Sequence, residues 1–228
     1  MRTSMNTMNH IVIFSHGFGV RKDGRGLLSD IAAGIPEVRS VLFDYNDYDS
    51  EQNTLTIYPF SDNVKRLAEV IAAERESDPK ATIDIITHSQ GAIIDALLCP
   101  TNIRKTIFLA PPLSMNIESS LARYRSVHGA KIDFTSVSKL PRSDGSTTLV
   151  PPEYWKEREE CDEPITLYNT VAEQGELTII SANQDTVLSE TSLVGLSPHV
   201  VRKGIDGDHD FGGPARQPLI YAIRSILV

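Results

Sequence analysis

Ser89 lies between two apolar segments, in the stretch from 83 to 98 that reads IDIITHSQGAIIDALL. A β-branched run that passes through a tight turn into a helical pattern is typical of a strand followed at once by a helix. At such a turn a serine hydroxyl projects away from the backbone, and the N-terminus of the following helix stabilises negative charge near it. Ser89 is therefore a candidate nucleophile; the alternative is that its side chain only caps the helix.

The same stretch resembles the nucleophile elbow of the α/β-hydrolase fold. The G-x-S-x-G pattern of that family is present as Thr87-His88-Ser89-Gln90-Gly91, with Thr87 in place of the first glycine. The resemblance covers nearly the whole chain. It implies a serine hydrolase in which the nucleophile is followed along the chain by an Asp or Glu and then by a His, each on a loop after a late strand.

A serine hydroxyl needs a base to take its proton and an acid to hold that base in the correct tautomer. In the order that the resemblance implies, Asp185 follows the fifth apolar run of the chain and His209 follows the sixth. Asp185 could instead cap a helix over 186–194. His199 is the rival base, but it opens the sixth run instead of following it. We therefore predict a catalytic triad of Ser89, Asp185 and His209.

The tetrahedral intermediate of acyl transfer carries a negative oxygen that needs hydrogen-bond donors. Residues 16–19 read HGFG and follow the first apolar run. The resemblance implies that the backbone N–H groups of Phe18 and Gln90 form this oxyanion hole. The glycines beside Phe18 permit the dihedrals that turn its amide inward, although a plain glycine turn would have the same sequence.

Six short apolar runs alternate with helical patterns, which predicts an α/β fold with a mostly parallel open sheet flanked by helices. Ser61 can cap a helix that ends at Asp78, and either Pro214 or Pro218 could occupy the first turn of a last helix. A chain of 228 residues is expected to form one domain, 1–228. The runs are Ile11–Phe14, Val38–Phe43, Ile83–Ile86, Thr106–Leu109, Leu177–Ile180 and His199–Ile205.

The stretch from about 111 to 175 interrupts this alternation, so we predict a core of 9–110 and 176–228 with a lid inserted between them. Within the lid, a hairpin is expected to turn at 141–145 between Ile132–Phe134 and Leu149–Val150, with short helices around it. Aromatic residues of the lid are expected to line an acyl pocket with Phe18; the alternative is that they only pack the lid. The predicted pocket residues are Phe18, Phe134, Tyr154 and Trp155.

The 22 Lys and Arg against 30 Asp and Glu give a net charge of −8, which disfavours nucleic acid and anionic lipid as partners. Two cysteines without C-x-x-C spacing predict a cytoplasmic location, and the first apolar run is too short for a membrane span. We expect no cofactor and no metal, because no G-x-G-x-x-G, H-E-x-x-H or H-x-H spacing occurs. The acidic stretch 44–49 is interpreted as a solvated loop that could disfavour anionic substrates.

These features predict a carboxylesterase that cleaves uncharged small-molecule esters through an acyl-enzyme intermediate. A thioesterase, lactonase or amidase would use the same triad. A ligand-binding protein and a cofactor-free haloperoxidase are alternatives from other classes, because a fold does not determine its function. The trio of Ser89, Asp185 and His209 favours an enzyme, since a binding protein has no physical need of it.

Overall fold

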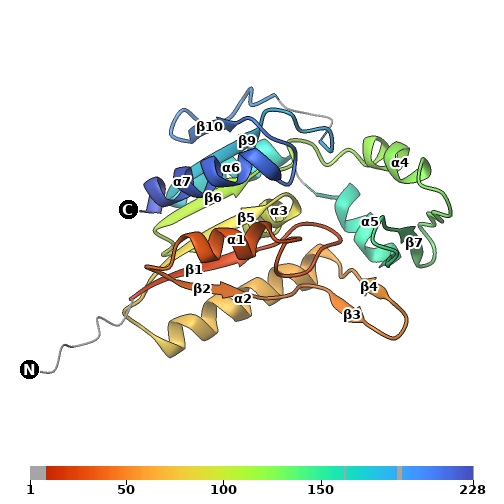
Figure 1. The fold of residues 1–228 in the computed structure, drawn as a ribbon, viewed down its shortest axis with the longest axis horizontal. Helices are drawn as coiled ribbons and strands as arrows, with labels where there is room; N and C mark the ends of the chain where they lie inside the picture. The colour runs from red at the N-terminus through yellow and green to blue at the C-terminus, as the bar shows by residue number, and fades with distance from the viewer. Residues whose placement is uncertain (1–8, 162, 189–191, 228) are drawn as a thin grey trace, which may run out of the picture.

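The computed structural model describes residues 9–161, 163–188 and 192–227, and a six-stranded parallel sheet forms its centre (Figure 1). The strands stand in the order β10-β9-β6-β5-β1-β2, and every neighbouring pair is parallel. All six overlap the predicted runs, so the predicted fold class is confirmed. The strands are β1 (His10–Ser15), β2 (Arg39–Leu42), β5 (Thr82–His88), β6 (Lys105–Leu109), β9 (Glu176–Ala182) and β10 (Val201–Ile205).

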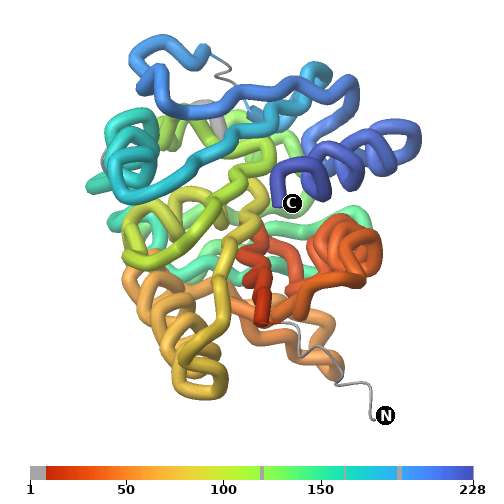
Figure 2. Tube along the Cα trace, turned by 90° about the vertical axis from the view of Figure 1, so that its left-hand side faces the viewer, coloured from red at the N-terminus to blue at the C-terminus, as the bar shows by residue number. Residues whose placement is uncertain are grey.

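Helices cover both faces of this sheet, because successive side chains of a strand point to opposite faces. On β1, Ile11 and Ile13 belong to one buried apolar cluster, whereas Val12 and Phe14 belong to the other. The flanking helices are α1 (Leu27–Gly34), α2 (Phe60–Ser77), α3 (Gln90–Leu98), α6 (Pro164–Gln174) and α7 (Arg216–Leu227). Figure 2 shows α1 and α7 on one side of the sheet and α2, α3 and α6 on the opposite side. A sheet buried on both faces explains why its strands appear as continuous apolar runs.

The predicted start of the helix after Ser61 needs correction, whereas the start of the last helix agrees with the prediction that Pro214 or Pro218 lies in its first turn. Ser61 does not cap α2, since the helix begins at Phe60 after Pro59 and Ser61 lies inside its first turn. The N–H and hydroxyl of Ser61 instead donate to Glu157 of α5 (Pro152–Glu159), at 2.8 and 2.6 Å. At the other end of the chain, a short 3₁₀ turn, η1 (Gly213–Ala215), precedes α7, and Pro218 lies in the first turn of α7.

A second sheet of four short strands, in the order β3-β4-β8-β7, lies at the carboxyl edge of the main sheet (Figure 1). The predicted hairpin is present, but its first strand is β7 (Ser138–Pro141) and not Ile132–Phe134; β8 (Thr147–Val150) is the second. Part of the acidic stretch that we interpreted as a loop is β3 (Asp47–Asp49), which pairs with β4 (Thr54–Thr56). The sequence analysis missed this strand because the sheet depends on a distant contact: the parallel partner of β4 is β8, far along the chain.

The segment between β6 and β9 divides into two parts. The helices α4 (Ile117–Arg125) and α5 stand with the small sheet beyond the carboxyl edge of the main sheet (Figure 1). The later helix α6 packs on the main sheet instead, since its Tyr168 contacts Phe108 of β6 with ring centroids 5.1 Å apart. In the described part of the chain, no helix is long and apolar enough to cross a membrane.

Candidate active site

Ser89 stands between β5 and α3 in a conformation unusual for a residue with a side chain, with φ 53° and ψ −125°. Such strain is typical of functional turns. The turn needs small neighbours: a Cβ atom on Gly91 would lie 2.4 Å from the carbonyl oxygen of Ser15, and one on Gly17 would lie 3.0 Å from the Cβ of Ser89. The Ser89 side chain makes no capping hydrogen bond to α3, so its hydroxyl is presented away from the helix.

Thr87, which departs from the family pattern, is fully buried on β5. Its side chain fits within the elbow, although its hydroxyl has no hydrogen-bond partner among the described residues. The departure therefore leaves the unpaired hydroxyl of Thr87 in the core, which costs stability, and leaves the position of Ser89 unaffected.

Ser89, His209 and Asp185 form one hydrogen-bonded chain. The Oγ of Ser89 lies 3.0 Å from Nε2 of His209, and Nδ1 of His209 lies 2.6 Å from Oδ2 of Asp185. A carboxylate only accepts, so Nδ1 carries the ring proton and Nε2 can accept the proton of the serine hydroxyl. The side chains of His209 and Asp185 are 10% and 4% exposed. The structure thus brings together, from three separate loops, the residues selected from the sequence.

Asp185 is held through both of its oxygens. Its Oδ1 accepts the N–H groups of Val187 at 2.7 Å and Leu188 at 3.0 Å. Burial by itself raises the pKa of Asp185, but the hydrogen bond and charge of His209, with these two N–H groups, bring the pKa below its usual value. No helix follows Asp185 in residues 186–188 or 192–194, and 189–191 lie outside the described chain. Asp185 closes a turn and orients His209.

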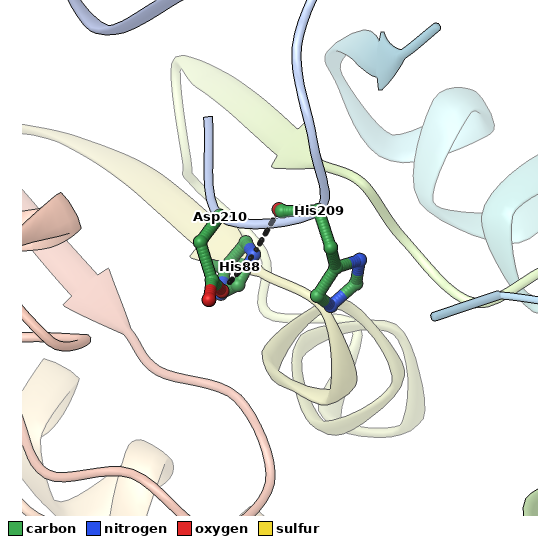
Figure 3. Close-up of side chains that lie close together, drawn as sticks. All are labelled: His88, His209 and Asp210. Atoms are coloured by element: carbon green, nitrogen blue, oxygen red, sulfur yellow. Dashed lines mark hydrogen bonds and ion pairs between the residues drawn. The ribbon is translucent and has the colours of Figure 1, made fainter. Parts of the chain in front are cut away.

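His88, beside the nucleophile, fixes the loop that carries His209. Its Nε2–H donates to the main-chain carbonyl oxygen of His209 at 2.9 Å, as Figure 3 shows. Burial, and after it the neighbouring His209, lower the pKa of His88 to about 4, so the ring is neutral at pH 7. From the sequence, His88 could be placed only in the turn, because no local pattern shows that it reaches a loop so much later in the chain.

His88, His209 and Asp210 also offer ligand atoms within 4.8 Å of one another, a spacing that a metal ion can use. Their nitrogens already have protein partners, however: Nε2 of His88 donates to a carbonyl oxygen, and both ring nitrogens of His209 belong to the chain with Ser89 and Asp185. Asp210 is 44% exposed and its Oδ1 lies 3.9 Å from Nε2 of His88. Hydrogen bonds within the protein account for this cluster.

Phe18 and Gln90 border the same cavity as Ser89. Gln90 is the first residue of α3, and its side chain is fixed because the hydroxyl of Tyr154 donates to its Oε1 at 2.6 Å. Both predicted oxyanion residues therefore line the cavity that Ser89 also lines.

The loop that carries Phe18 is anchored by His16. The Nε2 of His16 accepts the N–H of Tyr45 at 3.0 Å, and its Nδ1–H donates to the carbonyl oxygen of Gly17 at 2.9 Å. Burial lowers the pKa of His16. A neutral ring with its proton on Nδ1 satisfies both bonds, so His16 holds the loop in place.

The cavity above Ser89 has a volume of about 610 Å³, within the range of pockets that hold small molecules. Phe18 is part of its lining, as expected. The other predicted pocket residues are not: Tyr154 and Trp155 are 0% and 2% exposed within the apolar cluster, and Phe134 packs on the outer side of Trp155. These three aromatic residues pack the insertion, so the acyl-pocket prediction for them is wrong.

The cavity instead contains a feature that the sequence analysis missed. Four arginines line it: Arg25, Arg123, Arg142 and Arg158. They come from the β1–α1 loop, α4, the β7–β8 turn and α5, so no window of sequence contains them together. In a chain with a net charge of −8, a concentration of arginine at one cavity is a local reversal of sign.

No protein-family model matches the sequence, and no curated protein sequence matches it. Solved structures match its fold. Est1E from Butyrivibrio proteoclasticus superposes with a TM-score of 0.65 at 16% identity, over 96% of this chain and 86% of that one. The esterase Pf2001 from Pyrococcus furiosus gives 0.67 at 12% identity, over 96% and 80%. The esterase domain of a Rhodothermus marinus protein gives 0.64 at 12%, over 98% and 88%. The chain has an α/β-hydrolase fold.

Proposed function

We propose that this protein is a serine hydrolase that cleaves carboxylic esters through an acyl-enzyme intermediate. The observation that carries the proposal is the chain from Ser89 through His209 to Asp185, with Oγ–Nε2 and Nδ1–Oδ2 distances of 3.0 and 2.6 Å at the floor of a cavity. The esterases among the solved structures of the same fold support the same class of reaction.

In the proposed mechanism, Oγ of Ser89 attacks the ester carbonyl carbon while Nε2 of His209 takes the serine proton. The ionised Asp185 stabilises the imidazolium, and the N–H groups of Phe18 and Gln90 stabilise the negative oxygen. The imidazolium gives its proton to the leaving alcohol, and the acyl group remains on Ser89. Water then repeats these steps, with His209 as base, and releases the carboxylic acid.

The experiment is hydrolysis of p-nitrophenyl butyrate by the wild type, Ser89→Ala and Ser114→Ala, with circular dichroism to establish that each variant is folded. Ser114 lines the same cavity without contacting His209 in the described structure, so it is the matched control. We expect Ser89→Ala to lose about four or more powers of ten in kcat and Ser114→Ala to stay within a few-fold of the wild type. Full activity of a folded Ser89→Ala protein would remove the mechanism.

A further inference from the structure

The cavity above Ser89 combines apolar and polar lining residues with arginine side chains, three of which form no ion pair in the described part of the chain. Among the described residues, no carboxylate oxygen lies within 4.0 Å of the guanidinium nitrogens of Arg25, Arg123 or Arg142. Arg158 differs, since its Nε lies 3.5 Å from the carbonyl oxygen of Met115. Three cationic groups from three separate elements therefore face one cavity without a carboxylate at ion-pair distance.

Arg142 is the centre of this group. Its guanidinium lies over the loop of Phe18, since a Cβ atom on Gly19 would meet its Nη1 at 2.9 Å. Burial, and the positive charges of Arg25 and Arg123 close by, lower the pKa of Arg142. A guanidinium that is withdrawn from water beside two others is electrostatically unfavourable unless an anion joins it.

The described acids near this group do not pair with it directly. Asp144 accepts hydrogen bonds from Ser146 at 2.9 and 2.6 Å on the hairpin turn, and these bonds are the main cause of its lowered pKa. The charges of Arg25 and Arg142 also contribute to the lowered pKa of Asp144, but this residue is exposed and outside ion-pair distance. Asp210, the acidic residue of the lining, lies beside His88. The acidic stretch that we expected to repel anions is not part of the lining, and its Asp44 accepts the N–H of Lys22 at 2.6 Å.

The rest of the lining is mixed: polar residues such as Ser114 and Asn116 stand beside apolar ones such as Leu113 and Leu140. A ligand that suits the whole cavity is therefore amphipathic, with an apolar body and an anionic end. The guanidinium group binds planar carboxylates and phosphates through paired hydrogen bonds, which makes arginine the residue of choice for such recognition.

We propose that the substrate is an ester that carries an anionic group, a carboxylate or a phosphate, and that Arg142, Arg25 and Arg123 bind this group while Ser89 attacks the ester. The inference rests on the proposed function and replaces the expectation of uncharged esters. Because Gly19 adjoins Phe18, an anion on Arg142 fixes the substrate next to the loop that is expected to hold the oxyanion.

The test compares substrates of one length that differ in their terminal group: p-nitrophenyl hemiglutarate, its neutral methyl ester, and a p-nitrophenyl ester with a terminal phosphonate. We expect the wild type to have a kcat/KM for an anionic ester at least ten-fold above that for the neutral one. Arg142→Gln and Arg123→Gln should each lower this ratio by about ten-fold. The comparison of the hemiglutarate with the phosphonate ester shows whether the cavity prefers a carboxylate or a phosphate-like group.

The matched control is Arg125→Gln, on the same helix as Arg123 but outside the cavity lining and 3.9 Å from Glu118. It should keep the wild-type ratio. A wild-type ratio near one that neither Arg142→Gln nor Arg123→Gln changes would overturn the inference.

A binding measurement separates this inference from the proposed function. Calorimetry with the Ser89→Ala protein should show tighter binding of p-nitrophenyl hemiglutarate than of its methyl ester, and Arg142→Gln in that background should remove the difference. Anion-dependent binding without turnover by the wild type would overturn the hydrolase and retain the anion site. Equal binding of both esters would overturn the anion site, whatever the turnover.

Discussion

A buried carboxylate with basic partners lies near each end of β5, and the two are used differently. Near the amino end, Asp84 is fully buried and accepts the Nε–H of Arg104 and the N–H of Lys105, both at 3.0 Å, with Nε2 of His10 at 2.6 Å. Beyond the carboxyl end, Asp185 accepts two backbone N–H groups and one histidine, and that histidine faces the hydroxyl of Ser89.

Asp84 and Asp185 differ in the group to which their basic partner is bonded in turn. Arg104 keeps its charge at all physiological pH values and donates onward to the carbonyl oxygen of Leu227 at 2.8 Å, so it ties α7 to the sheet. His209 instead presents Nε2 to the hydroxyl of Ser89, 3.0 Å away, whose proton this nitrogen can accept. A similar buried carboxylate therefore stabilises the fold at one edge and, in the proposed mechanism, orients the base at the other.

We expect the largest effect from a substitution that breaks the hydrogen-bonded chain of Ser89, His209 and Asp185. His209→Ala should lower kcat on an ester by about four to six powers of ten, and the double variant with Ser89→Ala should be little worse, because the two residues act as one unit. Steady-state kinetics of the two single variants and the double variant measure this. Additive losses would mean that the two side chains act independently; the conservative control is His199→Ala, an exposed residue expected to keep wild-type turnover.

We expect the next largest effect from a substitution that breaks the cluster around Asp84, near the amino end of β5. Asp84→Asn should lower the free energy of unfolding by about 3 kcal/mol, because Arg104 and the N–H of Lys105 lose a charged acceptor. The loss is at the low end of the range for buried pairs, since the Arg104 side chain is 35% exposed. Urea unfolding measures it, and kcat should stay near the wild-type value.

Asp30→Asn is the matched control for Asp84→Asn. Asp30 pairs with Arg216 at 2.6 Å but is 58% exposed, so its loss should cost under about 1 kcal/mol. Equal losses in the two variants would contradict the distinction between a buried cluster and a surface pair.

A third carboxylate, Asp95 on α3, sharpens the comparison because neither of its buried oxygens has a hydrogen-bond partner among the described residues. Burial raises the pKa of Asp95 to about 7. Its folded pKa lies above the unfolded value, so the unfolded chain holds fewer protons between about pH 4 and 7, and stability falls as the pH rises through that window.

Asp95→Asn should remove this loss. Relative to the wild type, the free energy of unfolding of the variant should rise by about 4 kcal/mol between pH 4 and pH 8. Urea unfolding of both proteins at several pH values tests this. A difference in the free energy of unfolding that stays constant across the pH range would contradict the prediction, because the pKa of Asp95 would then be the same in the folded and unfolded chains.

The smallest expected effect concerns the support of the oxyanion residue. Tyr154→Phe removes the hydroxyl that donates to Gln90 at 2.6 Å, and should cost about 1 kcal/mol of stability with a few-fold loss in kcat. Parallel unfolding and kinetic measurements test both parts. A kcat loss as large as that of His209→Ala would place Tyr154 in the reaction itself.

Local sequence was sufficient wherever one run of residues decides the structure. The central strands β1, β5, β6 and β9 are mostly apolar runs because both faces of the sheet are covered there, and the elbow is visible because Ser89 and Gly91 occur at fixed spacing. Asp185 and His209 could be selected because the resemblance to the α/β-hydrolase fold implies an Asp or Glu and then a His on loops after late strands.

What the sequence could not show depends on contacts between distant segments. β3 is a three-residue strand with all its residues exposed, and it becomes part of a sheet only because β4 pairs with β8. The local sequence around Tyr154 and Trp155 does not distinguish side chains that face a pocket from side chains that face the core. The convergence of Arg25, Arg123 and Arg142 follows from the folding of three separate segments.

The most direct test of the account is reaction of the folded protein with a fluorophosphonate, followed by peptide mass spectrometry. An activated serine forms a covalent bond from Oγ to phosphorus with loss of fluoride, and the rate depends on the base that takes its proton. We expect one adduct per chain, on the peptide that contains Ser89, and no adduct at that position in His209→Ala over the same time. An unlabelled wild type, an adduct on another residue, or wild-type labelling of His209→Ala would contradict the assignment of Ser89 and His209 as nucleophile and base.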